Sequence, residues 1–239
     1  MRLPTLLQYL ACGLATLALA PSAMALALAG LHRTTYAMVR AWAWAVLMVS
    51  GVRFRVFGLD NLPDAGSCVV ISNHCSHLDG PVLARALPLP VYFIIKQELT
   101  RVPLWGWALV RIGFIAVDRD NSERAHQQMD EAVGSVHAGR SVLVFAEGTR
   151  STCDSLLPFK KGGFHLAVAA QAPILPVAIN HSRRLMPKGA PSPRPGVVDV
   201  HIGQPVPTLG MGRDDVDLLL ERTRAAITEM RRLDPDFVG

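Results

Sequence analysis

The stretch 68–79, whose sequence is CVVISNHCSHLD, decides the fold of this 239-residue chain. Its first five residues form a short run rich in β-branched side chains, which predicts a buried strand. A helix is expected directly afterwards, over residues 77–86, because prolines at positions 88 and 90 stop it. A buried strand that leads through a polar loop into a helix is typical of α/β proteins, where ligands bind at the carboxyl ends of strands.

The rest of the chain repeats this alternation of strands and helices. Apolar or alternating runs predict further strands at residues 52–56, 92–95, 114–117, 142–145, 174–179 and 197–202. Helices are expected from residue 121 or 122 to about 137, and from about 214 to 233. The sequence therefore predicts the α/β class: a single domain with a central mixed, largely parallel sheet flanked by helices, preceded by an N-terminal hydrophobic helical membrane anchor.

The first 50 residues are expected to form that anchor, and residues 51–239 the domain. No charged side chain occurs from Leu3 to Leu31, and a second apolar run covers 41–52. About 20 apolar residues can cross a bilayer. A cleaved secretory signal, a transmembrane anchor, and a helical hairpin whose first helix is interrupted at Pro21 and Ser22 all fit this segment.

The charge of the chain bears on its partners. The formal net charge of +5 suits an anionic lipid surface or nucleic acid. No basic tract with interleaved aromatics is present, so we expect membrane lipids and no nucleic acid. The arginines after the apolar segment outnumber Arg2 before it, which favours a cytoplasmic position for the domain. Four cysteines without a CxxC pair indicate reduced thiols.

The polar end of the opening stretch holds the first candidate site. A histidine beside a carboxylate can act as a general base, so His74 and Asp79 form a candidate catalytic pair. The pattern formed by Ser76 and Asp79 also matches an ordinary capped helix start. Cys75 as a nucleophile is a weaker alternative. A metal site is not expected either, because adjacent residues rarely converge on one ion and no spaced ligand pair occurs.

Other strand ends carry cations and a second polar loop. The stretch 145–151, FAEGTRS, combines Glu147, a flexible glycine, a hydroxyl and Arg150, which suits an anion as well as an ordinary turn. Lys96 ends one predicted strand, and Arg119 follows another. One edge of the sheet that collects a base and several cations predicts a ligand-binding site.

Four ordered blocks make the sequence resemble the glycerophospholipid acyltransferase family, typified by bacterial 1-acyl-sn-glycerol-3-phosphate (lysophosphatidic acid) acyltransferases. They are the NHxSxxD form of the HxxxxD motif at 73–79, GFIAVDR at 113–119, FAEGTRS at 145–151 followed by FKKG at 159–162, and APILPV at 172–177. The blocks lie within about residues 58–205. One departure is Ala146, where the family usually has proline.

The resemblance implies a role for each matched residue. His74 would deprotonate the acceptor hydroxyl and Asp79 would hold the imidazole. The phosphorylated acceptor would be bound by Lys96, Arg119, Glu147, Gly148, Thr149 and Arg150. The donor would be a thioester, acyl-CoA or acyl-ACP, and neither a metal nor another cofactor would be needed.

The resemblance also implies a reaction and a location. The acyl group would pass to the sn-2 hydroxyl of 1-acyl-sn-glycerol-3-phosphate, giving phosphatidic acid in phospholipid biosynthesis. The alternative acceptor is another lysolipid, such as lyso-ornithine lipid. Because such donors are cytosolic, the acyltransferase domain at 51–239 would face the cytoplasm at a bacterial inner membrane, and a cleaved export signal becomes the weaker alternative.

Overall fold

A seven-stranded mixed sheet forms the centre of the computed structural model, which describes residues 5–63, 66–118 and 122–234. The sheet order is β1-β7-β6-β2-β5-β3-β4. The strands are β1 (Val52–Phe57), β2 (Val69–Ser72), β3 (Val91–Lys96), β4 (Ile115–Val117), β5 (Ser141–Phe145), β6 (Ile174–Asn180) and β7 (Gly196–Ile202). Each of the seven strands predicted from the apolar runs is present.

The direction of the strands decides where a site can form. Strands β6, β2, β5, β3 and β4 run parallel to one another, whereas β7 is antiparallel to β6 and parallel to β1. The carboxyl ends of five strands therefore meet at one edge of the sheet. The predicted mixed, largely parallel sheet is confirmed.

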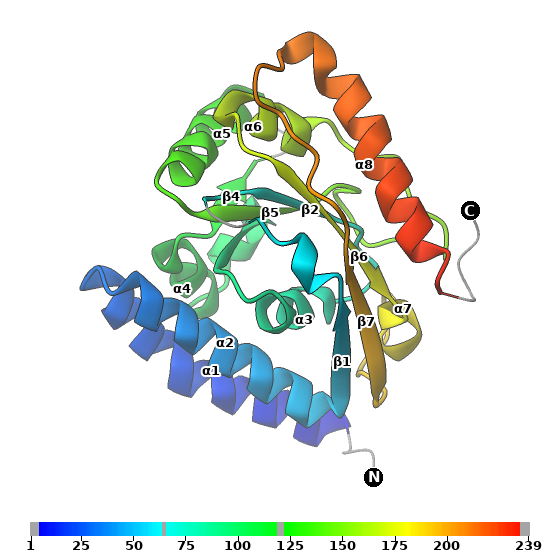
Figure 1. The fold of residues 1–239 in the computed structure, drawn as a ribbon. Helices are drawn as coiled ribbons and strands as arrows, with labels where there is room; N and C mark the ends of the chain where they lie inside the picture. Colours follow the sequence, from blue (N-terminus) through cyan, green and yellow to red (C-terminus); the bar gives the residue numbers. More distant parts are fainter. Residues whose placement is uncertain (1–4, 64–65, 119–121, 235–239) are drawn as a thin grey trace.

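Helices cover both faces of the sheet (Figure 1). One face carries α3 (Asp79–Ala86), α4 (Trp105–Ile112) and the pair α1 (Thr5–Leu28) and α2 (His32–Ser50); the other carries α5 (Ser122–His137), α6 (Gly162–Ala170) and α8 (Val216–Arg231). The side chains of β2 alternate between two cores, since Val70 belongs to the first and Val69 and Ile71 to the second. The short helix α7 (Ser182–Leu185) follows β6.

The N-terminal segment forms a hairpin of two helices that lie side by side (Figure 1). The prediction that Pro21 and Ser22 interrupt the first helix is wrong, because α1 continues through both residues. A proline removes only one backbone donor, and the Ser22 hydroxyl donates to Ala18 O one turn earlier at 3.4 Å. Among the helices within the described ranges, α1 alone is long and apolar enough to cross a membrane, by length and composition.

Arg40 joins the hairpin to the rest of the fold. This α2 side chain donates to three backbone carbonyls at the end of α3, those of Ala84 at 3.0 Å, Leu87 at 2.8 Å and Arg85 at 3.2 Å. These are the carbonyls that a helix end leaves without partners. The guanidinium therefore caps α3 and holds the hairpin against it.

Candidate active site

The loop between β2 and α3 brings His74 and Asp79 together. His74 Nδ1 lies 2.8 Å from Asp79 Oδ2. The same oxygen accepts the backbone N–H groups of Cys75 at 2.7 Å and of Ser76 at 2.8 Å. Asp79 is fully buried, so these three hydrogen bonds fix the loop and the imidazole in one arrangement. Because the carboxylate holds Nδ1, Nε2 is the ring nitrogen left for a substrate.

The predicted cap is present in part. Asp79 reaches back to the N–H group of Ser76, as the pattern predicts. The Ser76 hydroxyl, however, donates to Met186 O at 2.9 Å and accepts the N–H group of Leu78 at 3.2 Å. A turn closed by Asp79 N–H and Ser76 O precedes the helix, so α3 begins at Asp79, two residues later than predicted. One carboxylate thus orients the imidazole and closes the turn.

Phe145, the last residue of β5, covers one face of the imidazole. The two rings are stacked with centroids 4.0 Å apart and planes inclined by 14°. Rotation of the His74 ring would break this stack as well as the hydrogen bond to Asp79. The base is therefore held by two elements that meet at the carboxyl edge of the sheet.

Glu147 binds the protein's own backbone. Its Oε1 accepts the N–H group of His74 at 2.7 Å, and its Oε2 accepts the N–H group of Leu157 at 2.9 Å. The side chain is buried, and burial raises the pKa of this carboxyl while the two backbone hydrogen bonds oppose the rise. Both oxygens therefore position the site from within the protein, whereas the resemblance implied that Glu147 binds the acceptor.

The loop after Glu147 lines the same cavity as His74. Gly148 has a φ of 68°, in the region that favours glycine. The N–H group of Ser151 donates to His74 O at 2.7 Å, so the loop is tied to the histidine on both sides. Arg150 lines the same cavity as His74. Its charge also helps to lower the pKa of His77, after the larger effect of desolvation, which places the guanidinium within electrostatic reach of the motif.

The other predicted cations differ in their surroundings. Lys96 lines the cavity from the end of β3, and its Nζ forms an ion pair with Glu98 Oε1 at 2.6 Å. The side chains of both residues are about half exposed. Arg119 lies outside the described residues; β4 ends just before it, at Val117.

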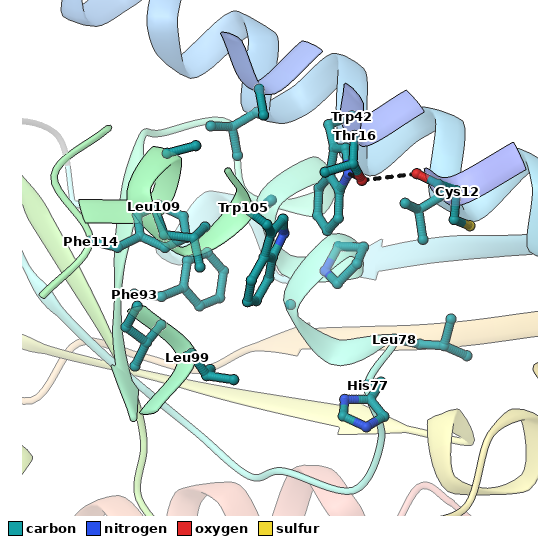
Figure 2. A pocket seen from close by; sticks show the side chains of 18 of the residues that line it. Cys12, Thr16, Trp42, His77, Leu78, Phe93, Leu99, Trp105, Leu109 and Phe114 are labelled. Atoms are coloured by element: carbon teal, nitrogen blue, oxygen red, sulfur yellow. Dashed lines mark hydrogen bonds between the residues drawn. The ribbon is translucent and has the colours of Figure 1, made fainter. Parts of the chain in front are cut away.

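A cavity of about 640 Å³ extends from the His74 loop to the helical hairpin. Its lining comes from α1, α2, α3, β3 and α4, and from the short 3₁₀ helix η2 (Gln97–Arg101). Figure 2 shows how aromatic side chains of different elements enter it, among them Trp42, Trp105 and Phe114. The wall is mostly apolar away from the His74 loop, although Gln8 and Thr16 of α1 also line it, so much of the cavity suits an alkyl chain.

The sequence contained Asn73 without indicating what it does. Its amide oxygen accepts the N–H group of Ile179 at 2.8 Å and its Nδ2 donates to Ile179 O at 3.0 Å. The side chain thereby continues the pairing of β2 with β6 beyond the end of β2. An asparagine directly after a buried strand was the available signal, but the partner lies more than 100 positions away.

The alternative in which Cys75 is the nucleophile finds little support. Cys75 is buried, and burial raises the pKa of its thiol to about 12, so it is protonated near neutral pH. Within the described ranges, no group of three or more histidine, cysteine or acidic side chains could hold a metal ion.

Known proteins are similar to this chain in sequence. The acyltransferase family model matches residues 53–180. The 1-acyl-sn-glycerol-3-phosphate acyltransferase of Pseudomonas aeruginosa is 34% identical over 187 residues, covering 78% of this chain and 72% of that protein. The 1-acyl-sn-glycerol-3-phosphate acyltransferase alpha of Homo sapiens is 36% identical over 191 residues, covering 79% and 68%.

A solved structure agrees with these matches. The 1-acyl-sn-glycerophosphate (LPA) acyltransferase PlsC from Thermotoga maritima aligns with a TM-score of 0.73 and 26% identity, covering 84% of this chain and 80% of that chain. Fold and sequence together therefore define an enzyme that transfers acyl groups. The chain belongs to the acyltransferase family, which confirms the resemblance found in the sequence.

Proposed function

We propose that this acyltransferase moves an acyl group from acyl-CoA or acyl-ACP to the sn-2 hydroxyl of 1-acyl-sn-glycerol-3-phosphate, forming phosphatidic acid. The observation that carries the proposal is the His74–Asp79 pair in the wall of an apolar cavity that Arg150 also lines. The names of the relatives support the same acceptor.

In the proposed reaction His74 acts as the general base. Its Nε2 takes the proton of the acceptor hydroxyl while the hydroxyl oxygen attacks the thioester carbonyl. Asp79 stabilises the imidazolium that forms. When the tetrahedral intermediate collapses, the C–S bond breaks and the imidazolium returns the proton to the leaving thiolate. The acyl group passes directly to the acceptor oxygen, so the enzyme forms no covalent intermediate and uses no metal or bound cofactor.

The phosphate of the acceptor would bind beside the loop after Glu147. A guanidinium suits bidentate phosphate recognition, and no ion pair to Arg150 occurs among the residues that the structure describes. Gly148 and Thr149 line the cavity next to Arg150. Lys96 would join them by exchanging Glu98 for the phosphate, and Arg119 is proposed on the resemblance alone.

The hairpin and the adjoining helix α4 would dock the enzyme on a membrane. Seven exposed large apolar side chains lie on α1 alone: Leu6, Leu7, Tyr9, Leu10, Leu14, Leu17 and Leu28. Water is a poor solvent for such a face, and both proposed substrates carry alkyl chains. We place the enzyme at the cytoplasmic face of a bacterial inner membrane, where the thioester donor is available.

The test is an assay of the purified full-length chain in detergent–lipid micelles. Palmitoyl-CoA and palmitoyl-ACP are each offered with lysophosphatidic acid and with lyso-ornithine lipid, and the products are analysed by mass spectrometry. We expect phosphatidic acid from lysophosphatidic acid. Acylation of lyso-ornithine lipid alone would overturn the proposed acceptor, and the better of the two donors identifies the physiological thioester.

A further inference from the structure

Helix α1 places two polar side chains, Gln8 and Thr16, in the lining of the cavity beside apolar ones such as Leu19, and several leucines at the exterior. Leu6, Leu10 and Leu14 follow one another at helical spacing and are 70%, 54% and 66% exposed. Gln8 and Thr16 line the cavity instead, and Gln8 is only 4% exposed. Burial of a glutamine costs free energy unless its amide is hydrogen-bonded, so the buried position of Gln8 calls for a reason.

Gln8 differs from Thr16 in its hydrogen bonding. The Thr16 hydroxyl donates to Cys12 O at 2.8 Å and accepts Trp42 Nε1–H at 3.0 Å. Gln8 Oε1 is buried and finds no hydrogen-bond partner within the part of the chain that the structure describes. Because Gln8 lines the cavity, a change in its side-chain torsions can present this unpaired acceptor to a ligand that brings a hydrogen-bond donor.

The surroundings of Gln8 connect it to the catalytic loop. Thr5 Oγ1 and Ser192 Oγ are 3.0 Å apart, and the Tyr9 hydroxyl donates to Pro191 O, so the start of α1 is fastened to the loop after α7. Ser192 lines the cavity together with Gln8, as does Met186 at the beginning of that loop. The backbone of Met186 accepts the hydroxyl of Ser76 from the HxxxxD motif.

We propose that Gln8 is a substrate-binding residue that accepts a hydrogen bond from an amide N–H or a hydroxyl of the bound acyl donor. The inference rests on the proposed function. Apart from the hydroxyl that reacts, the uncharged part of 1-acyl-sn-glycerol-3-phosphate consists of ester oxygens and an alkyl chain. None of these groups can donate a hydrogen bond. The donor offers two sources: the amide N–H groups of its pantetheine arm, or a hydroxyl on the acyl chain.

The test compares Gln8→Leu with the wild-type full-length chain in the same micelles, with palmitoyl-CoA and 3-hydroxypalmitoyl-CoA as donors. We expect the KM for the donor to rise about 3- to 10-fold, the loss that one neutral hydrogen bond corresponds to. The KM for lysophosphatidic acid and kcat stay unchanged. A rise with both donors assigns the pantetheine arm, and a rise with the hydroxylated donor alone assigns the chain hydroxyl. An unchanged KM for both donors overturns the inference.

Two control variants separate a lost hydrogen bond to the donor from a disturbance of packing. Gln127→Leu, the same change on the exposed side of α5, should leave both KM values unchanged. Gln8→Met, with a side chain of similar length, repeats the test where leucine disturbs the packing. A stabilising shift in Tm on adding palmitoyl-CoA, smaller in Gln8→Leu than in wild type, tests donor binding without turnover. Absence of phosphatidic acid with the wild type would refute the proposed function, whereas an equal Tm shift in both chains would refute the role of Gln8.

Discussion

Replacement of Asp79 by asparagine tests the catalytic pair at its most constrained atom. Asp79 Oδ2 accepts hydrogen bonds from His74 Nδ1 and from two backbone N–H groups. Its other oxygen, Oδ1, is buried without a partner among the described residues. An asparagine can place its oxygen at the Oδ2 position and keep all three hydrogen bonds. Its NH2 group then occupies the buried position of Oδ1. The turn survives, but the negative charge beside the imidazole is lost.

The size of the expected effect follows from this geometry. The hydrogen bond of 2.8 Å sets the charge centres of carboxylate and imidazolium roughly 4 Å apart. At an effective dielectric constant of about 20, such a pair is worth roughly 4 kcal/mol, or about 10³-fold in rate. The unpaired NH2 group costs a further 1–3 kcal/mol or so of folding free energy. We therefore expect kcat to fall about 10³-fold and stability to fall modestly.

The assay follows release of free thiol from palmitoyl-CoA by the Asp79→Asn chain, with urea unfolding measured on the same preparation. Asp60→Asn, on the exposed turn after β1, is the matched control and should retain full activity. A loss of less than 10-fold in kcat from a folded Asp79→Asn chain would refute the reasoning that the carboxylate stabilises the imidazolium.

Three further changes probe the supports of the site. Glu147→Gln leaves the N–H group of His74 or Leu157 without an acceptor, so the free energy of unfolding in urea should drop by about 1–3 kcal/mol. Burial raises the pKa of Glu147, so its protonated form stabilises the fold of the wild type. This contribution is fully present below the ordinary carboxyl pKa of 4.5 and is lost as pH rises through the raised value. Urea titrations at several pH values should show this decrease in unfolding free energy for the wild type and not for the variant. Phe145→Ala removes the ring stacked on His74, and kcat should fall by about 3- to 10-fold with the KM values unchanged. Arg40→Met uncaps α3, and Tm should decrease in proportion to roughly 1.5–3 kcal/mol, whereas an unchanged Tm would mean that the hairpin is held by apolar contacts alone.

Local patterns were sufficient to predict the sheet. Each strand is a short run with its own apolar signal, and the run at 69–72 is completely buried, as its composition predicts. Helix α4 was not predicted although Trp105, Ala108 and Ile112 have helical spacing. With eight residues it is too short for periodicity to stand out. The path of α1 through Pro21 was also misjudged, because packing against α2 outweighs the loss of one backbone hydrogen bond.

The site was predictable only where its contacts are local. His74 and Asp79 are close in sequence, so the motif itself contains the information for their hydrogen bond. The stacking of Phe145 on His74 and the hydrogen bonds of Glu147 to the backbone join β2 to β5, and only the sheet order reveals them. The cavity is likewise a product of packing, because its walls come from the hairpin and from helices that lie far along the chain.

The most direct test of the account is the rate of phosphatidic acid formation by His74→Ala. The purified chain is mixed with palmitoyl-CoA and lysophosphatidic acid, and the product is quantified by mass spectrometry beside His165→Ala, a substitution of an exposed histidine on α6. We predict that folded His74→Ala loses about 10²–10⁴-fold in rate, while His165→Ala matches the wild type. Undiminished turnover by folded His74→Ala would contradict the proposal that this histidine is the general base.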